Sequence, residues 1–195
     1  MKQEWTISDT KKLFETGLSD NPNIEACKSS QNELMVPESF DWREENPECV
    51  QEPLKQSREC TAGYVLSTIS AAEDRICKFG KKEPVRLSSQ ELIDCDKNIE
   101  CSRGTINKLL QWGKRRGFIL DSCYPWAGKA GECPDEHLAE NECRQSNNLY
   151  KIVDFCIASE TDGIKKEILA NGPVLGQLNP YTDLLTYSEG VYSRT

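Results

Sequence analysis

The hydrophobic pattern is most regular in the stretch Lys55 to Cys77, KQSRECTAGYVLSTISAAEDRIC. In its second half Val65, Ile69, Ala72 and Ile76 recur at spacings of three or four residues. Such spacing places apolar side chains on one side of a helix and predicts a buried helix. A cysteine-bearing turn precedes it. We expect the rest of the chain to be arranged around this element.

Two shorter helices are predicted downstream. In VRLSSQELIDC, residues 85–95, a helix should begin at Ser88 or Ser89, because Ser88 and Glu91 have the spacing of a capping box. The hydroxyl would accept a hydrogen bond from a first-turn amide while the carboxylate returns one to the backbone. The next helix pattern runs from Ile106 to Arg116, with Ile106, Leu109, Leu110 and Gly113 on one side, and Gly117 ends it.

The last part of the chain mixes strand and helix patterns. Leu149 to Ile157, LYKIVDFCI, alternates well enough to predict a strand. A helix follows from Thr161, with Asp162 as its cap. Its inward face should hold Ile164, Ile168 and Leu169. Asn171-Gly172-Pro173-Val174 then ends the helix and starts another strand.

Length and charge narrow the classes of function. The chain has 195 residues, a net charge of -8 and a pI near 4.9, which allows one large domain or two small ones. Nucleic acids and anionic membrane surfaces require clustered positive charge, so neither partner is expected. The basic cluster Lys114-Arg115-Arg116 closes a helix pattern, where cations complement the helix dipole.

Ten cysteines are spread along the chain rather than paired as CxxC, which favours disulfides in an oxidising compartment. They are Cys27, Cys49, Cys60, Cys77, Cys95, Cys101, Cys123, Cys133, Cys143 and Cys156. Zinc is the rival interpretation, but no ligand spacing is present and the only histidine, His137, lies in a polar stretch. We therefore expect no metal and no cofactor.

The sequence shows neither a membrane span nor a secretory signal. It contains no run of about 18 apolar residues, so no membrane span is expected. Residues 1–14 contain no apolar core of a secretory signal. Since the cysteines favour a secreted or endolysosomal location, we expect that a signal was removed from this sequence or that Met1 was added to it.

The stretch Lys55 to Cys77 resembles the active-site segment of the papain family of cysteine peptidases, QGSCGSCWAFS followed by a long central helix. In that family the second Cys, at the helix start, is the nucleophile. Read without gaps, Tyr64 falls on the family's Trp and Gly63 falls on the nucleophile. Because glycine has no side-chain atom that could attack a carbonyl, acyl-enzyme chemistry is not expected there.

The same alignment leaves two questions open. Ser57 occupies the position of the family's oxyanion-hole Gln, but Gln56 could serve instead if the turn holds one extra residue. Cys60 matches the family's first Cys, a disulfide partner. Its alternative, a displaced nucleophile, is the less favoured interpretation.

Further motifs follow in family order and point to the cathepsin B branch. VPESFDWREENPEC, from Val36, looks like the start of a mature cathepsin B, and LSSQELIDC keeps every fixed letter of the family's Leu-Ser-x-Gln-x-Leu-x-Asp-Cys. The resemblance implies an α+β, papain-like two-domain fold. Residues 37–148 would form the helical left domain and 149–195 a truncated, β-rich right domain. Residues 1–36 would be a propeptide-like segment, with Trp5, Leu13 and Phe14 as anchors, and a loosely held tail is the alternative.

Residues 100–104 stand where the family has Gly-Cys-Asn-Gly-Gly, the wall of the substrate groove. Ser102, Arg103 and Gly104 would therefore form the groove wall. Arg103 should partly obstruct the groove if its side chain lies inward, whereas an arginine turned to solvent is the alternative. Trp126, in a Tyr-Pro-Trp turn, is expected to pack in the core rather than to serve as a ligand platform.

The resemblance also implies disulfide pairs. Cys49–Cys77 is bridged in the cathepsin B branch, and Cys60–Cys101 and Cys95–Cys133 follow by analogy with the family. Cys123–Cys143 is a weaker expectation. Cys27 and Cys156 are left over and could pair with each other.

In the family the catalytic His and the Asn that orients it lie after the region that ends here at Thr195. Together with Gly63 this predicts a catalytically inactive cathepsin B-like pseudoprotease that acts as a binding or scaffold subunit. A protein partner would cover the truncated right domain. The alternative is a cysteine-type endopeptidase represented by a truncated or mutated sequence.

Overall fold

The computed structural model describes residues 24–28, 33–80, 83–134, 142–145, 149–178 and 181–193. The expected propeptide anchors Trp5, Leu13 and Phe14, the single histidine His137, and most of segment 1–36 lie outside the described residues.

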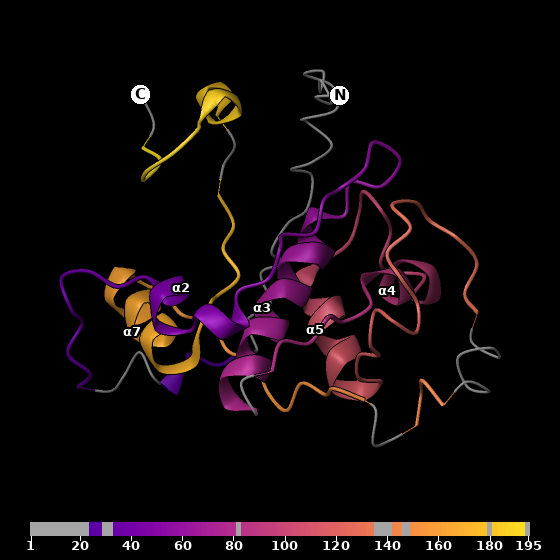
Figure 1. The fold of residues 1–195 in the computed structure, drawn as a ribbon, viewed down its shortest axis with the longest axis horizontal. Coiled ribbons are helices and arrows are strands. Elements are labelled where there is room, and N and C mark those ends of the chain that lie inside the picture. Colours follow the sequence, from indigo (N-terminus) through magenta and orange to yellow (C-terminus); the bar gives the residue numbers. More distant parts are fainter. Residues whose placement is uncertain are drawn as a thin grey trace.

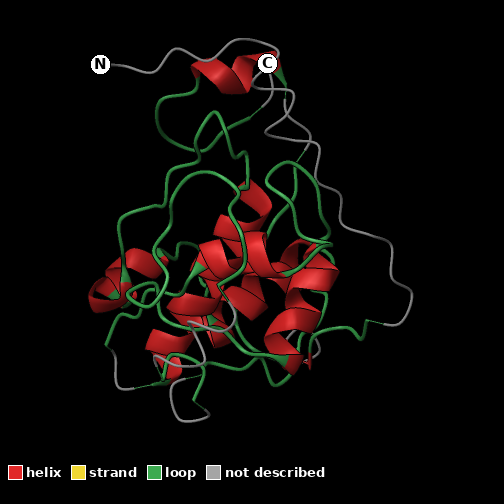
Figure 2. Ribbon diagram, turned by 90° about the vertical axis from the view of Figure 1, so that its right-hand side faces the viewer, coloured by secondary structure: helices red, strands yellow, loops and turns green. Residues whose placement is uncertain are grey.

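Helices account for the regular structure of the described residues (Figure 2). In chain order they are α2 (Trp42–Glu45), the 3₁₀ helix η2 (Pro47–Cys49), α3 (Gly63–Phe79), α4 (Ser89–Cys95), α5 (Ile106–Arg115), α7 (Thr161–Asn171) and the 3₁₀ helix η4 (Thr182–Thr186). Figure 1 shows α3 in the middle of the molecule, with α4 and α5 to one side of it and α2 and α7 to the other.

Helix α3 forms the centre of the core, as the periodicity predicts. Val65 and Ile69 are fully buried, and they belong to one apolar cluster with Leu92 of α4, Leu109 of α5 and the following Phe118. Burying an aliphatic or aromatic side chain of this size contributes about 1.5–3 kcal/mol. Three other segments pack against the central helix, and we infer that it organises the fold for this reason.

The start of α4 confirms half of the expected capping box. Ser88 is the N-cap, and its hydroxyl accepts a hydrogen bond from the Glu91 amide at 3.1 Å. The prediction that the Glu91 carboxylate accepts from the backbone of Ser88 is wrong, because the Ser88 amide donates to Ile119 O at 2.9 Å. Glu91 instead forms a buried ion pair with Arg144. The backbone before α4 is paired with the segment after α5 through an isolated antiparallel bridge between Leu87 and Leu120.

The other helices depart from the sequence pattern in detail. Helix α5 ends one residue earlier than expected, and Gly117 follows with φ +76°, a conformation that glycine adopts without strain. Its buried face includes Trp112, while Leu110 is only partly buried.

The expected cap and inward face of α7 are also wrong in part. Glu160, not Asp162, is the N-cap, and no side chain caps this end. Ile164 is exposed, and the buried positions are Gly163 and Glu167. Glu167 faces inward because Arg75 of α3 donates to it at 3.0 Å. An ion pair with the central helix thus decides which face of α7 is buried.

Two strands expected near the end of the chain are not formed among the described residues. In segment 149–157 only Tyr150 and Ile157 pair, in isolated bridges with Phe118 and Ala26. Residues 172–178 have no strand hydrogen-bonding pattern. A strand needs a neighbour along its whole length, and these segments meet one at single residues only.

All ten cysteines are paired, and none is free. The pairs are Cys27–Cys156, Cys49–Cys77, Cys60–Cys101, Cys95–Cys133 and Cys123–Cys143. These include the four pairs implied by the resemblance and the pairing of the two remaining cysteines. Five disulfides fit an oxidising compartment. Among the described residues no helix is long and apolar enough to cross a membrane.

A buried carboxylate, Glu73 of α3, binds the segment that leads into α4. It accepts a hydrogen bond from Leu87 N at 2.7 Å and pairs with Arg86 at 3.2 Å. Burial raises the pKa of Glu73 to about 7, and the carboxylates of Asp74 and Asp121 act in the same direction. The Leu87 amide and Arg86 oppose this rise without cancelling it.

We expect Glu73 to make the protein less stable as the pH rises from about 4.5 to 7. Because its pKa in the folded state lies above the value of an exposed glutamate, the folded state binds the extra proton in this range. The stabilisation is complete below pH 4.5 and is lost through pH 7. Glu73→Gln should remove about 3 kcal/mol of this pH dependence, measured as the difference between urea unfolding curves of the two proteins at each pH. Parallel pH profiles for the two proteins would contradict the assignment.

Candidate functional site

The start of α3 has the backbone of a nucleophile site without the nucleophile. Gly63 is the first residue of the helix, and Ala62, the N-cap, provides no side-chain hydrogen bond. The first amides of a helix lack intrahelical acceptors and carry a partial positive charge. A thiolate placed here would be stabilised, but residue 63 has no side chain.

The side chain that lies against Gly63 is that of Gln56. A Cβ atom built on Gly63 would lie 3.2 Å from both Gln56 Nε2 and Gln56 Oε1. Gln56 Oε1 is buried and has no hydrogen-bond donor among the described residues. Of the two oxyanion candidates, the structure brings Gln56 to the helix start, as expected if the turn holds one extra residue.

Ser57 is used in the turn itself. Its hydroxyl accepts a hydrogen bond from Cys60 N at 2.9 Å and donates to Gly128 O. Trp126 Nε1 donates to Lys55 O at 3.1 Å, so the turn is also held from the 121–131 loop. Trp126 is partly buried against the core, in line with a packing role. These contacts fix the backbone on both sides of Gln56.

Cys60 cannot take over as the nucleophile. It is fully buried and bonded to Cys101. A sulfur in a disulfide has no thiolate form to attack a carbonyl. The interpretation of Cys60 as a displaced nucleophile is therefore wrong.

The groove-wall segment is fastened to the helix start by Tyr64. The Tyr64 hydroxyl donates to Glu100 O at 2.7 Å and lies 3.1 Å from Arg103 O. Burial raises the pKa of this hydroxyl, which keeps it protonated as a donor. A Cβ atom on Gly104 would collide with the Tyr64 hydroxyl, so a larger residue here would displace the tyrosine from its two backbone carbonyls. The tyrosine in place of the family's Trp thus has a structural role that the motif alone did not reveal.

The Arg103 side chain is turned to solvent. Its side chain is 80% exposed and pairs with Glu100 at 3.5 Å. Ser102 is also exposed. Of the two alternatives for Arg103, the structure has the arginine turned to solvent, where its guanidinium pairs with Glu100 three residues earlier.

One group of possible metal ligands comes together among the described residues. Cys27, Cys156 and Glu167 have donor atoms within 4.8 Å of one another. The two cysteines form a disulfide, and a metal requires the thiolate. This group therefore cannot hold an ion while the disulfide is intact.

Comparisons with known proteins agree with this geometry. The family model described as "Papain family cysteine protease" matches residues 36–195. The mouse protein "Tubulointerstitial nephritis antigen-like" is 29% identical over 185 residues, which cover 83% of this chain and 39% of that protein. "Cathepsin B-like CP3" of Giardia intestinalis is 28% identical over 166 residues, covering 82% of this chain and 54% of its own length. The chain thus spans between about two-fifths and about half of these relatives.

A solved structure supports the fold. "proCathepsin B S9 from Trypanosoma congolense" aligns with a TM-score of 0.66 at 22% identity, over 87% of this chain and 61% of that chain. The family model matches most of the sequence, and Gln56 lies beside the first residue of α3. The two observations together are specific for the family. The chain belongs to the papain family of cysteine proteases and resembles its cathepsin B-like members.

Proposed function

We propose that this protein is a cathepsin B-like pseudoprotease, which binds peptide or protein ligands without cleaving them. The observation that carries the proposal is Gly63, which stands at the start of α3 beside Gln56 where the family has its thiol. Nucleophilic catalysis needs an activated side chain at this point. Of the two candidates among the described residues before the helix start, neither replaces it, because Cys60 is in a disulfide and the Ser57 hydroxyl accepts from Cys60 N and donates to Gly128 O.

The parts of the site that serve binding are in place. The amide of Gln56 lies at the helix start, next to the first N–H groups of α3. Such donors bind the carbonyl oxygen of a peptide. The groove-wall segment is anchored by Tyr64 and by the Cys60–Cys101 disulfide, so the surface is preformed.

The second candidate is a cysteine-type endopeptidase represented by a mutated or incomplete sequence. The retained Gln56 and the helix start favour a peptidase ancestor. A single exchange of Cys for Gly would leave the neighbouring residues intact. Ser57 and Arg103, however, also differ from the family pattern, which favours the pseudoprotease.

The test is to treat the oxidised protein with a thiol-directed epoxide probe and with a panel of fluorogenic peptides. We expect no labelled cysteine by mass spectrometry and no cleavage. Immobilised peptide libraries should still retain the protein, and Gln56→Ala should weaken retention. Cleavage of the peptides together with labelling of one cysteine would establish the peptidase instead.

A protein partner and a secreted or endolysosomal location are part of the same proposal. Several apolar side chains of the last described segments are exposed, among them Val153 (89%), Leu178 (57%) and Val191 (98%). Large apolar side chains exposed in this number favour the proposal that a partner covers them. Light scattering of the purified protein, alone and with candidate partners, measures this directly. A soluble monomer that captures nothing would count against the partner.

A further inference from the structure

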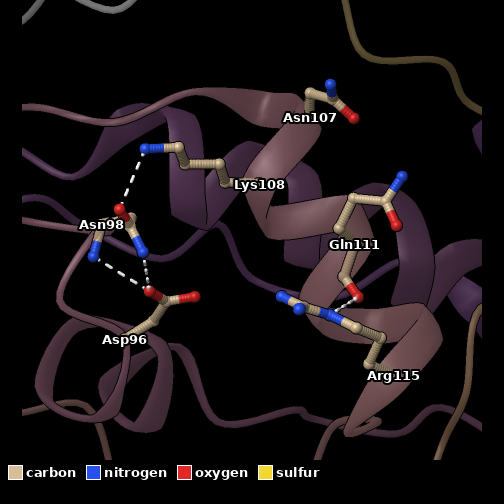
Figure 3. Close-up of a pocket in the computed structure, with 6 residues that line it drawn as sticks. All are labelled: Asp96, Asn98, Asn107, Lys108, Gln111 and Arg115. Atoms are coloured by element: carbon tan, nitrogen blue, oxygen red, sulfur yellow. Dashed lines mark hydrogen bonds between the residues drawn. The ribbon is translucent and has the colours of Figure 1, made fainter. Parts of the chain in front are cut away.

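A cavity lies beside α5 and shares no residue with the Gly63 site. Its volume is about 370 Å³, within the range of sites for small ligands. The lining residues are Asp96, Asn98, Asn107, Lys108, Gln111 and Arg115. Figure 3 shows Lys108 reaching across to Asn98, and the guanidinium of Arg115 turned towards the side of Asp96. All six side chains end in polar groups, which favours a polar ligand.

Two elements build this cavity. The turn after α4 is fixed because the backbone and side-chain nitrogens of Asn98 donate to Asp96 Oδ1, at 2.9 and 3.0 Å. The opposite wall is one face of α5, since Asn107, Gln111 and Arg115 follow one another at four-residue spacing. The cavity therefore has rigid walls on both sides.

The charges in the cavity favour an anion. Lys108 Nζ donates to the amide oxygen of Asn98 at 3.0 Å, and Arg115 Nε donates to Gln111 O at 3.4 Å. Within the described part of the chain neither cation is paired with a carboxylate. Two cations thus face one carboxylate, Asp96. This makes the cavity locally positive in a chain of net charge -8.

The basic cluster at the end of α5 separates into three different roles. Lys114 pairs with Asp154 at 3.0 Å, and the guanidinium of Arg116 lies 4.6 Å from the Trp112 ring centroid. Arg115 alone points to the cavity. The helix dipole explains why cations are tolerated here, but it does not explain an arginine without a carboxylate partner in a cavity lined by amides.

We propose that this cavity binds an acidic sugar, a hydroxylated ring that carries one sulfate or phosphate ester. Arg115 and Lys108 bind the ester oxygens, because guanidinium and ammonium groups form charge-assisted hydrogen bonds with them. Asp96 and the amides of Asn98 and Gln111 bind ring hydroxyls as acceptors and donors. A nucleotide fits less well, since no aromatic or apolar side chain lines the cavity to stack on a base.

Calorimetric titration of the intact chain tests the proposal with glucose 6-sulfate and glucose 6-phosphate as probes. We expect Kd values of about 1 mM, the affinity of a small polar ligand, that weaken as salt rises. Glucose and inorganic sulfate should each bind at least about tenfold more weakly, because each offers only half of the contacts. Sulfate as tight as glucose 6-sulfate would show an adventitious anion site and overturn the proposal.

Matched variants locate the binding. Arg115→Gln should weaken glucose 6-sulfate about tenfold, which is the worth of one good charged contact. Lys114→Gln removes the same charge from the adjacent residue, which lies outside the cavity, and should leave Kd unchanged within about twofold. Equal losses in both variants would reduce the effect to net charge and overturn the site.

The same ligand chemistry could come from a free sugar ester or from the sulfated end of a longer saccharide. A sulfated hexasaccharide compared with glucose 6-sulfate distinguishes these sources. If a longer saccharide is the source, the hexasaccharide should bind more tightly than the monosaccharide, and its affinity should still depend on Arg115. If Arg115→Gln still binds the hexasaccharide but no longer binds the monosaccharide, the hexasaccharide binds elsewhere on the protein. The ligand of the cavity is then the free sugar ester.

Discussion

Replacing Arg144 by methionine will lower the free energy of unfolding by about 3–5 kcal/mol, since it leaves Glu91 charged and unpaired in the core. The Glu91 side chain is fully buried and Arg144 is 14% exposed, so water does not replace the lost partner. Arg144 also donates to Arg116 O at 3.2 Å. Burial lowers the pKa of Arg144, so its charge is costly to keep in this position.

The measurement is urea or thermal unfolding with the disulfides intact. For a chain of this size the loss should lower Tm by about 6–20 °C. The double variant Glu91→Leu/Arg144→Met removes both charges and should recover most of the stability, because an apolar pair of similar volume is close to neutral. Arg103→Met serves as the control, since its ion pair is exposed and should change stability by less than about 1 kcal/mol. Equal stability of Arg144→Met and the wild type would show that the pair is not formed.

This ion pair also shows where inference from sequence stops. The serine–glutamate spacing at 88–91 correctly predicted where α4 begins. The partner of Glu91 lies 53 positions later, in a polar segment without periodicity. Local spacing identifies caps because both groups are neighbours in the chain. It cannot identify a partner that is brought close only by the fold and the Cys123–Cys143 disulfide.

The candidate site follows the same division. Gly63 could be assigned from sequence because the gapless resemblance to the papain family's active-site segment places it on the nucleophile position, and α3 begins at this residue. The choice between Ser57 and Gln56 could not, since it depends on how many residues the preceding turn holds. The direction of Arg103 and the contact between Tyr64 and Gly104 are decided by side-chain packing. The strands failed for a related reason, as a strand depends on neighbours that its own residues do not specify.

Placing cysteine at position 63 will change the protein from one without a reactive thiol to one with a single reactive thiol. All ten native cysteines are bonded, and Gly63 is only partly buried. The new Cβ would contact the Gln56 amide at 3.2 Å, a distance that a small shift of this flexible side chain relieves. We expect Gly63→Cys to react with one equivalent of iodoacetamide, and peptide mapping should locate the label at position 63.

The helix start should lower the pKa of this thiol by about 1 unit or more from the free value of about 8.5. Ser67→Cys is the matched control, since residue 67 is exposed one turn further along α3 and away from the first-turn amides. The pH midpoint of alkylation should therefore lie lower for Gly63→Cys than for Ser67→Cys. Below both midpoints the gain in rate is only about threefold per unit, since a more acidic thiol is also less nucleophilic. Identical midpoints would mean that the start of α3 does not stabilise a thiolate.

Peptide turnover separates the thiol from the rest of the machinery. In these 195 residues the only imidazole is His137, which precedes the Asn171-Gly172-Pro173 motif after which the family places its base. Gly63→Cys should therefore label without cleaving, because a thiolate needs an acid near the leaving nitrogen. Turnover by this variant would show that another group supplies the proton, and Gly63 would then be the one change that separates this chain from an active peptidase.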